Sequence, residues 1–110
     1  MSESLKKVDV FQAIADPTRR DVLRLLASKE RSIAEITSNY DMSRTAIVKH
    51  LNVLTEAGLV TGQKLGREKV YHLKLEPLTE VKQWLDYYEQ FWHNKLSKLK
   101  FLVENEDEDK

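Results

Sequence analysis

The stretch that decides the fold is SRTAIVKHLNVLTEAGLV, residues 43–60, which has two contrasting faces at helical spacing. Ser43 is a residue type that caps helix N-termini, and Gly58 stands where a C-terminal glycine usually ends a helix. Between them, apolar residues recur every three or four positions, as on the buried side of an amphipathic helix: Ile47, Leu51 and Leu54. The stretch predicts a helix over residues 43–57.

The opposite face of this helix is short, chemically mixed and free of acidic residues. A surface helix usually carries long polar residues such as Glu, Lys and Gln, which form helices well and stay solvated. The face comprises Arg44, Thr45, Val48, Lys49 and Asn52. We interpret it as a DNA-reading surface, and the alternative for each residue is an ordinary solvated position.

The chemistry of these side chains suits the DNA major groove, which is about 12 Å wide and admits a helix. Arg44 can make a bidentate contact to guanine, and Asn52 can pair with adenine or contact a phosphate. Thr45 and Val48 can touch a thymine methyl group, and Lys49 can reach a phosphate or a guanine. Ser43 and His50 complete the candidate contacts, although a hydrogen-bonded packing role is equally open for His50.

Two shorter helices and an initial helix are predicted upstream. The apolar spacing from Val8 to Ala15 indicates a first helix. Asp16 and Pro17 can begin a second helix as cap and first residue, with a buried side of Val22, Leu23, Leu25 and Leu26. Ser32 and Glu35 form the pattern of a capping box, which starts a third helix with Ile33, Ala34 and Ile36 inside and an end near Asn39. A short connection then joins it to the helix from Ser43, which is typical of a helix-turn-helix.

Downstream, the period changes from helical to alternating. Residues 70–75 alternate between the two sides of a strand, and Gly66 can adopt positive φ at a hairpin tip near Leu65–Glu68. The cations Lys64, Arg67 and Lys69 give this hairpin the charge to contact the DNA backbone near residues 62–70. A helix-turn-helix followed by a hairpin predicts a mainly α winged-helix fold, with five helices and a two-stranded wing.

Pro77 precedes a long last helix with two apolar stripes. One stripe is Leu78, Val81, Leu85, Tyr88, Trp92, Leu96, Leu99 and Val103, and the second is Trp84, Tyr87 and Phe91. Two stripes imply two packing partners, because a monomer would expose an unusually large apolar patch. We therefore expect a homodimer through the first and last helices, with contacts from Val8, Phe11, Trp84, Tyr87, Tyr88, Phe91 and Trp92. Burial of both stripes within one chain is the alternative, and which stripe faces the partner stays open.

The composition limits the remaining possibilities. The chain has 110 residues, no cysteine and a net charge of zero, which suits one domain over residues 1–103 without disulfides. Residues 1–75 contain 13 Lys/Arg and 9 Asp/Glu, whereas residues 76–110 contain 5 and 9, so the first part is mildly basic. The acidic residues 104–110 are expected to form a flexible tail. No signal peptide or membrane-length apolar run occurs, so we expect a cytoplasmic protein.

Three segments together resemble the ArsR/SmtB family of bacterial winged-helix regulators over roughly residues 8–100. They are FQAIADPTRRDVLRLL, SIAEITSNYDMSRTAIVKHLNVLTEAGLV and GREKVYHLKLEPL. The last helix, with WLDYYEQFWHNKLSKL, resembles the metal-independent branch. The resemblance implies a homodimeric transcriptional repressor on a palindromic operator.

The sequence departs from the metal-sensing members of that family. Their Cys-x-Cys corresponds to Ser32 and Ala34 here. Asp86, Glu89 and His93 lie at i, i+3 and i+7, within reach of one ion, but the paired His-rich pattern of a tight zinc site is absent. We expect neither a metal nor another cofactor. The sequence contains no Gly-rich phosphate loop, no Gly-x-Ser-x-Gly turn and no His-Glu-x-x-His motif, so we expect no enzyme.

Two alternatives to a simple DNA-binding repressor stay open at this level. A winged helix can instead bind protein, in which case salt-sensitive DNA affinity would be missing. An unknown effector bound between the first and last helices could also control DNA binding, and no residue pattern identifies one. Nor does the sequence reveal the operator, the regulated genes, or whether binding represses or activates.

Overall fold

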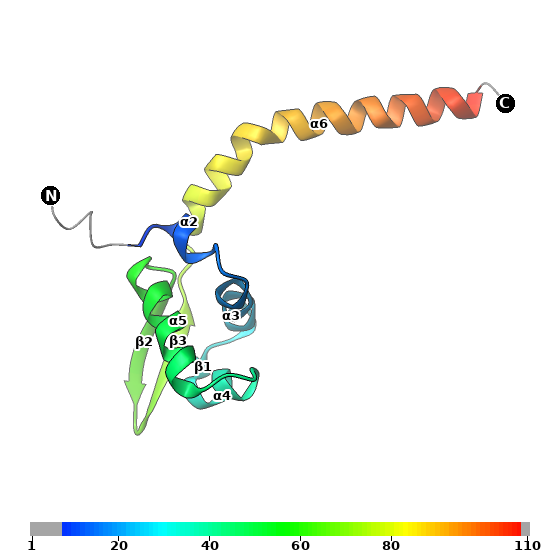
Figure 1. Ribbon diagram of the computed structural model, residues 1–110. Coiled ribbons are helices and arrows are strands. Elements are labelled where there is room, and N and C mark those ends of the chain that lie inside the picture. Colours follow the sequence, from blue (N-terminus) through cyan, green and yellow to red (C-terminus); the bar gives the residue numbers. More distant parts are fainter. Residues whose placement is uncertain (1–7, 109–110) are drawn as a thin grey trace, which may run out of the picture. The chain divides into compact units, whose positions relative to one another are not determined.

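The computed structural model describes residues 8–108 and divides into two compact units, with the boundary between Thr79 and Glu80. Each unit is described by itself. The elements of the first unit are α2 (Val10–Ala13), α3 (Pro17–Ser28), β1 (Arg31–Ser32), α4 (Ile33–Ser38), α5 (Arg44–Glu56), β2 (Val60–Leu65) and β3 (Glu68–Leu73) (Figure 1). The last helix, α6 (Leu78–Glu108), accounts for the second unit.

Side-chain caps start the helices of the first unit where the sequence predicts them. The Asp16 carboxylate accepts a hydrogen bond from the Arg19 backbone N–H at 3.0 Å, and Pro17 is the first residue of α3. Ser32 and Glu35 form the reciprocal capping box of α4. The predicted helix over 8–15 is shorter than expected, because Asp9 caps it and α2 covers only Val10–Ala13.

The core lies where α3, α4 and α5 meet the sheet. The predicted apolar side of α5 is fully buried, with Ile47, Leu51 and Leu54 each at 0% exposure. Two expectations on the neighbouring helices are wrong: Leu25 is only half-buried, and Ala34 is exposed. The reason for Ala34 is that α4 has only six residues, and its buried side consists of Ile33 and Ile36, three positions apart.

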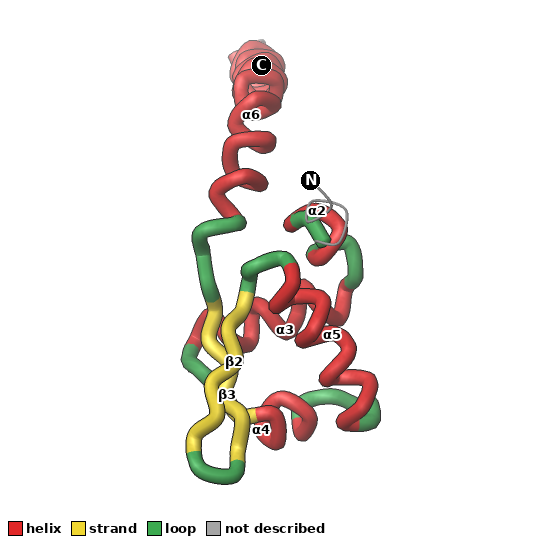
Figure 2. Tube along the Cα trace, turned by 90° about the vertical axis from the view of Figure 1, so that its left-hand side faces the viewer, coloured by secondary structure: helices red, strands yellow, loops and turns green. Residues whose placement is uncertain are grey.

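The predicted hairpin is present, and a third strand joins it. The sheet is antiparallel with the order β1-β3-β2. Figure 2 shows β2 and β3 side by side in the hairpin. Leu65 pairs with Glu68, so Gly66 and Arg67 form the tip, and Gly66 adopts a φ of +65°. The two residues of β1 pair with Tyr71 and Val70, and a strand this short has no alternation that a sequence pattern could reveal.

The helix α6 begins directly after Pro77, as predicted, and continues further than expected. It extends through Glu108, so the described part of the acidic segment 104–110 is helical, and residues 109 and 110 lie outside the described residues. The five helices of residues 8–108 and the small sheet confirm the mainly α winged-helix prediction. None of these helices combines the length and the apolar character needed to cross a membrane.

Replacing Leu51 by Ala is expected to lower the free energy of unfolding by about 2–5 kcal/mol, because it leaves a cavity beneath α5. The matched control is Leu75→Ala, since Leu75 is 64% exposed in the loop before α6, and it should change stability by less than about 0.5 kcal/mol. Urea denaturation, monitored by circular dichroism, measures the unfolding free energy of both variants. Equal losses for the two variants would contradict the described core.

Candidate nucleic-acid interface

The outer face of α5 is available to a ligand in the described chain. The inner face packs against α3, α4 and β2, which leaves four predicted contacts exposed: Arg44, Thr45, Lys49 and Asn52. Val48, expected to be exposed, is half-buried and therefore offers only part of its surface. The face carries two cations and no carboxylate, as the sequence predicts.

Ser43 has a structural task in addition to its predicted one. Its hydroxyl oxygen accepts a hydrogen bond from the Ala46 backbone N–H at 3.1 Å and caps α5. The residue is exposed, so its O–H can still donate to an acceptor such as a phosphate oxygen. The N-terminal end of α5 also carries the partial positive charge of a helix N-terminus, which favours an anion.

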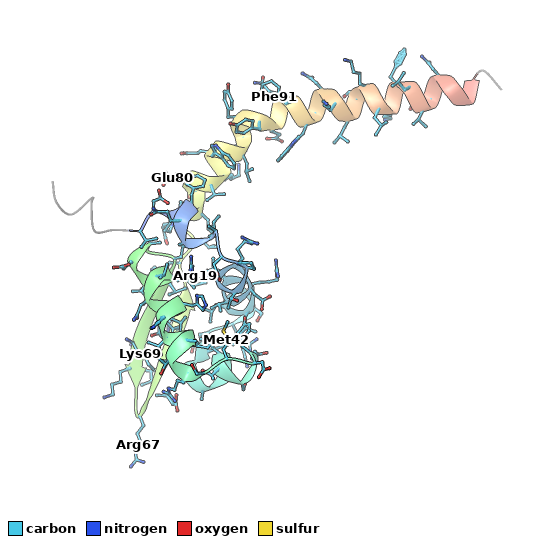
Figure 3. The ribbon with its side chains drawn as sticks, viewed as in Figure 1. Arg19, Met42, Arg67, Lys69, Glu80 and Phe91 are labelled. Atoms are coloured by element: carbon cyan, nitrogen blue, oxygen red, sulfur yellow. The ribbon has the colours of Figure 1, made fainter. Side chains whose placement is uncertain are left out.

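The wing gathers its three predicted cations at one end of the hairpin. Lys64 and Lys69 are direct partners across β2 and β3, and Arg67 lies at the turn. Figure 3 shows Arg67 projecting from the tip and Lys69 extending from β3. All three residues are exposed, and the Lys69 Nζ lies 5.6 Å from the centre of the Tyr71 ring. The cluster therefore combines positive charge with solvent access.

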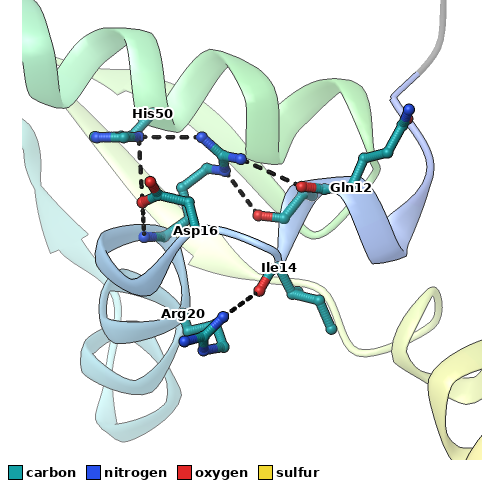
Figure 4. Close-up of polar contacts among 7 residues, drawn as sticks. Gln12, Ile14, Asp16, Arg20 and His50 are labelled. Carbon is teal, nitrogen blue, oxygen red and sulfur yellow. Dashed lines mark hydrogen bonds and ion pairs between the residues drawn. The ribbon is translucent and has the colours of Figure 1, made fainter.

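His50 lies in a polar network that joins α5 to the start of α3 (Figure 4). Its Nδ1 is 3.4 Å from the Arg19 Nη1 and 3.9 Å from the nearer Asp16 carboxylate oxygen. The Arg19 Nε donates to the Ala13 carbonyl at 2.7 Å, and Nη2 donates to the Gln12 carbonyl at 3.2 Å. His50 could either contact DNA or have a hydrogen-bonded packing role. The contacts with Arg19 and Asp16 favour the packing role.

Capping of α3 also changes the pKa of Asp16. The hydrogen bond from the Arg19 backbone N–H lowers the pKa of the Asp16 carboxyl, with a smaller contribution from the nearby His50. Because the lowered pKa belongs to the folded state, this contribution to stability is present above the ordinary Asp pKa and is lost as the pH falls through the lowered value. Arg19 is not among the residues predicted from the sequence, although its side chain contacts both α2 and α5.

A second contact, between Tyr40 and Asp21, holds the turn between α4 and α5. The Tyr40 hydroxyl donates to Asp21 at 2.8 Å, and Asp21 also pairs with Arg24 at 3.3 Å. Burial raises the pKa of Tyr40, and the Asp21 hydrogen bond adds to this effect. The contact fixes the loop that leads into α5 against α3. It joins residues 19 positions apart, so no local pattern indicates it.

Four of the aromatic residues expected at the dimer contact are in ring contact, so Tyr88 of the first predicted stripe adjoins Trp84, Tyr87 and Phe91 of the second. The rings of Trp84 and Tyr88 are 5.3 Å apart, those of Tyr87 and Tyr88 are 4.9 Å apart, and Tyr87 also contacts Phe91. These four residues and Trp92 are exposed in the single chain, whereas Val8 and Phe11 are half-buried. Such an apolar surface is typical of a protein contact.

The described residues contain no group of three or more His, Asp or Glu side chains arranged to hold a metal ion. Asp86, Glu89 and His93 follow one another along α6 without forming such a group. His72 of β3 lies with its Nδ1 3.1 Å from a Glu30 carboxylate oxygen. These residues give no geometric support to a metal site.

Comparison with known proteins agrees with the geometry. Residues 16–61 match the profile of "Bacterial regulatory protein, arsR family". The chain is 32% identical to the transcriptional repressor SdpR of Bacillus subtilis, over 70% of this chain and 86% of SdpR. It is 33% identical to the HTH-type transcriptional regulator Rv2034 of Mycobacterium tuberculosis, over 90% of each chain.

A solved structure shows the same fold. The crystal structure of the ArsR family transcriptional regulator RHA00566 is similar with a TM-score of 0.68 and 35% identity, covering 76% of this chain and 86% of that one. Residues 16–61, which match the family profile, contain the helix-turn-helix described above. The chain therefore belongs to the ArsR family of bacterial regulatory proteins and is a DNA-binding transcriptional regulator with a winged helix.

Proposed function

We propose that this regulator is a homodimeric repressor that occupies a palindromic DNA operator in the cytoplasm. The observation that carries the proposal is the exposed, acid-free outer face of α5 beside a wing with three exposed cations. Ile47, Leu51 and Leu54 on the inner side of α5 are completely buried, so this face is presented in one orientation. The name of SdpR, a transcriptional repressor, supports the direction of regulation.

The proposed contacts divide by chemistry. Arg44, Thr45, Val48 and Asn52 read base edges in the major groove, with Lys49 at a guanine or a phosphate. Ser43 and the wing residues Lys64, Arg67 and Lys69 contact the backbone, which positions the protein and makes affinity salt-dependent. His50 supports α5 from the side through Arg19 and Asp16.

We propose a dimer because a single α5 contacts only a few bases. Each good bidentate contact discriminates by about 1–3 kcal/mol, so one α5 reads too few bases for useful specificity and two are needed. We assign the subunit contact to Val8, Phe11, Trp84, Tyr87, Tyr88, Phe91 and Trp92. The two α5 helices then enter successive major grooves about 34–36 Å apart.

Replacing Arg44 by Ala is expected to weaken operator binding by about 1–3 kcal/mol and to relax the preference at one base position, because a bidentate guanine contact is lost. The operator is first obtained by selecting bound duplexes from random DNA at two salt concentrations, and gel shifts then measure affinity. The matched control is Arg24→Ala, an exposed arginine of α3 outside the proposed interface. Unchanged operator affinity in the Arg44 variant would remove the base-reading assignment.

Replacing Arg67 by Ala is expected to weaken binding to all sequences alike. The loss of one phosphate contact should also reduce the slope of log affinity against log salt concentration by about 1. Titrations of operator and random DNA at several salt concentrations measure both effects. A wild-type chain without salt-sensitive DNA affinity would instead favour a winged-helix module that binds protein.

A further inference from the structure

Gly62 is a glycine inside a strand, at a position where the backbone does not require one. It is the third residue of β2, and unlike Gly58 and Gly66 it has no positive φ. Glycine inside a strand weakens the strand and often marks a place where another group approaches closely. The reason for this glycine therefore lies in the side chains around it.

Two side chains occupy the space above Gly62. Gly62 is the direct partner of Tyr71 in the pairing of β2 with β3. A Cβ atom added at Gly62 would lie 2.7 Å from the Lys69 Cε and 2.9 Å from the Tyr71 Cε2, which is too close for carbon atoms that are not bonded. Only a residue without a side chain leaves room for both the lysine chain and the tyrosine ring.

The Lys69 side chain lies against the Tyr71 ring. The two residues are two positions apart on β3, so their side chains lie on the same side of the sheet. Tyr71 is only 2% exposed, so packing fixes its ring. The Lys69 Nζ lies 5.6 Å from the centre of this ring, a position in which the ring attracts a cation. The free space at Gly62 and the Tyr71 ring together hold the lysine chain.

The other two cations of the wing lack such contacts. Lys64 is the direct partner of Lys69 across the hairpin, and Arg67 lies at the turn. Among the described residues 8–108, neither side chain has a hydrogen bond, an ion pair or a ring contact. Lys64 has the same charge and the same height on the hairpin as Lys69, so it is the natural reference for it.

We propose that Gly62 and Tyr71 position the ammonium group of Lys69 for a phosphate of the DNA backbone. The proposal rests on the DNA contact of the wing proposed above and identifies the wing cation that is oriented before DNA binds. Lys69 is exposed, and its ammonium group has three N–H donors, so a ring on one side leaves donors for a phosphate oxygen. Gly62 and Tyr71 act through Lys69 and are therefore positioning residues.

Orientation before binding lowers the cost of the phosphate contact. A free lysine side chain has many rotamers, and fixing it on a phosphate costs conformational entropy. Lys69 has lost part of this freedom in the chain without DNA, whereas Lys64 has to be ordered when DNA binds. The two lysines are therefore expected to contribute unequally to affinity.

Replacing each lysine by Met compares the two contributions, because Met keeps an apolar chain and removes the charge. Lys69→Met should weaken operator binding about two- to fivefold more than Lys64→Met, which is the range of a cation–π contact at an exposed site. Gel shifts with the operator selected as above measure both affinities. Equal losses would contradict the proposal.

NMR spectra of the natural chain without DNA test the position of Lys69 directly. Protons above the face of an aromatic ring resonate upfield, so the Hε protons of Lys69 should resonate upfield of those of Lys64. In the Gly62→Ala variant the Lys69 signals should move back toward those of Lys64, because the added methyl group displaces the end of the lysine chain. Equal Hε shifts for the two lysines in the natural chain would overturn the proposal.

A double-mutant cycle connects this position with DNA binding. Gly62→Ala should weaken operator binding about two- to fivefold. The loss should vanish in a Lys69→Met chain, which has no cation to position, and should remain complete in a Lys64→Met chain. A loss that persists in the Lys69→Met chain would show that the glycine has only a structural role.

The added methyl group of Gly62→Ala also meets the buried Tyr71 ring, so the fold of this variant has to be checked. Circular dichroism and urea denaturation show whether it is folded. If it is not, the Hε shifts of the natural chain and the comparison of Lys69→Met with Lys64→Met decide the proposal, since both lysines are exposed.

Failure of this proposal differs from failure of the proposed function, because the NMR comparison needs no DNA. Salt-sensitive operator binding with equal Lys64 and Lys69 shifts would overturn the positioning and leave the DNA role intact. Upfield Lys69 signals in a chain without DNA affinity would overturn the proposed function, although Gly62 and Tyr71 would still hold the lysine.

Discussion

The structure of the first unit, which ends at Thr79, depends on burial of the apolar side of α5. Ile47, Leu51 and Leu54 are completely buried, and each lies on the same side of a 13-residue helix. Their burial fixes the rotation of α5 about its own axis, because turning the helix would bring polar residues into the core and leave them without hydrogen-bond partners. The identity of the outward residues is therefore a consequence of the core, and so is the chemistry that α5 can offer to DNA.

Local physical chemistry explains why much of this fold could be predicted. Asp16, Ser32 and Ser43 act as caps because each satisfies a backbone N–H within three residues of itself. The sequence also shows Gly66 at the wing tip, where a positive φ is needed. Such features depend on a few neighbouring residues, which a single sequence contains in full. Which residues contact DNA or a second subunit remains a prediction, since those contacts involve molecules that the sequence does not contain.

Features that depend on distant residues could not be predicted in the same way. The strand β1 has two residues and exists only because β3 offers an edge to pair with. Ala34 has the apolar side chain expected at an inner position, but its exposure depends on where α4 lies against its neighbours. The Arg19 guanidinium reaches His50, 31 positions away, and an arginine in a basic pair gives no sign of such a partner. Helix length also escaped prediction, since an acidic end that suggests a tail continues α6 to Glu108.

The Arg19 side chain has a mechanical consequence. One guanidinium holds the carbonyl groups of Gln12 and Ala13 in α2 and lies beside His50 in the middle of α5. Because a guanidinium is planar and rigid, it holds α2 and the middle of α5 at a fixed separation at this point. Arg44 lies on the same helix as His50, so one side chain relates the position of α2 to that of the outer face of α5.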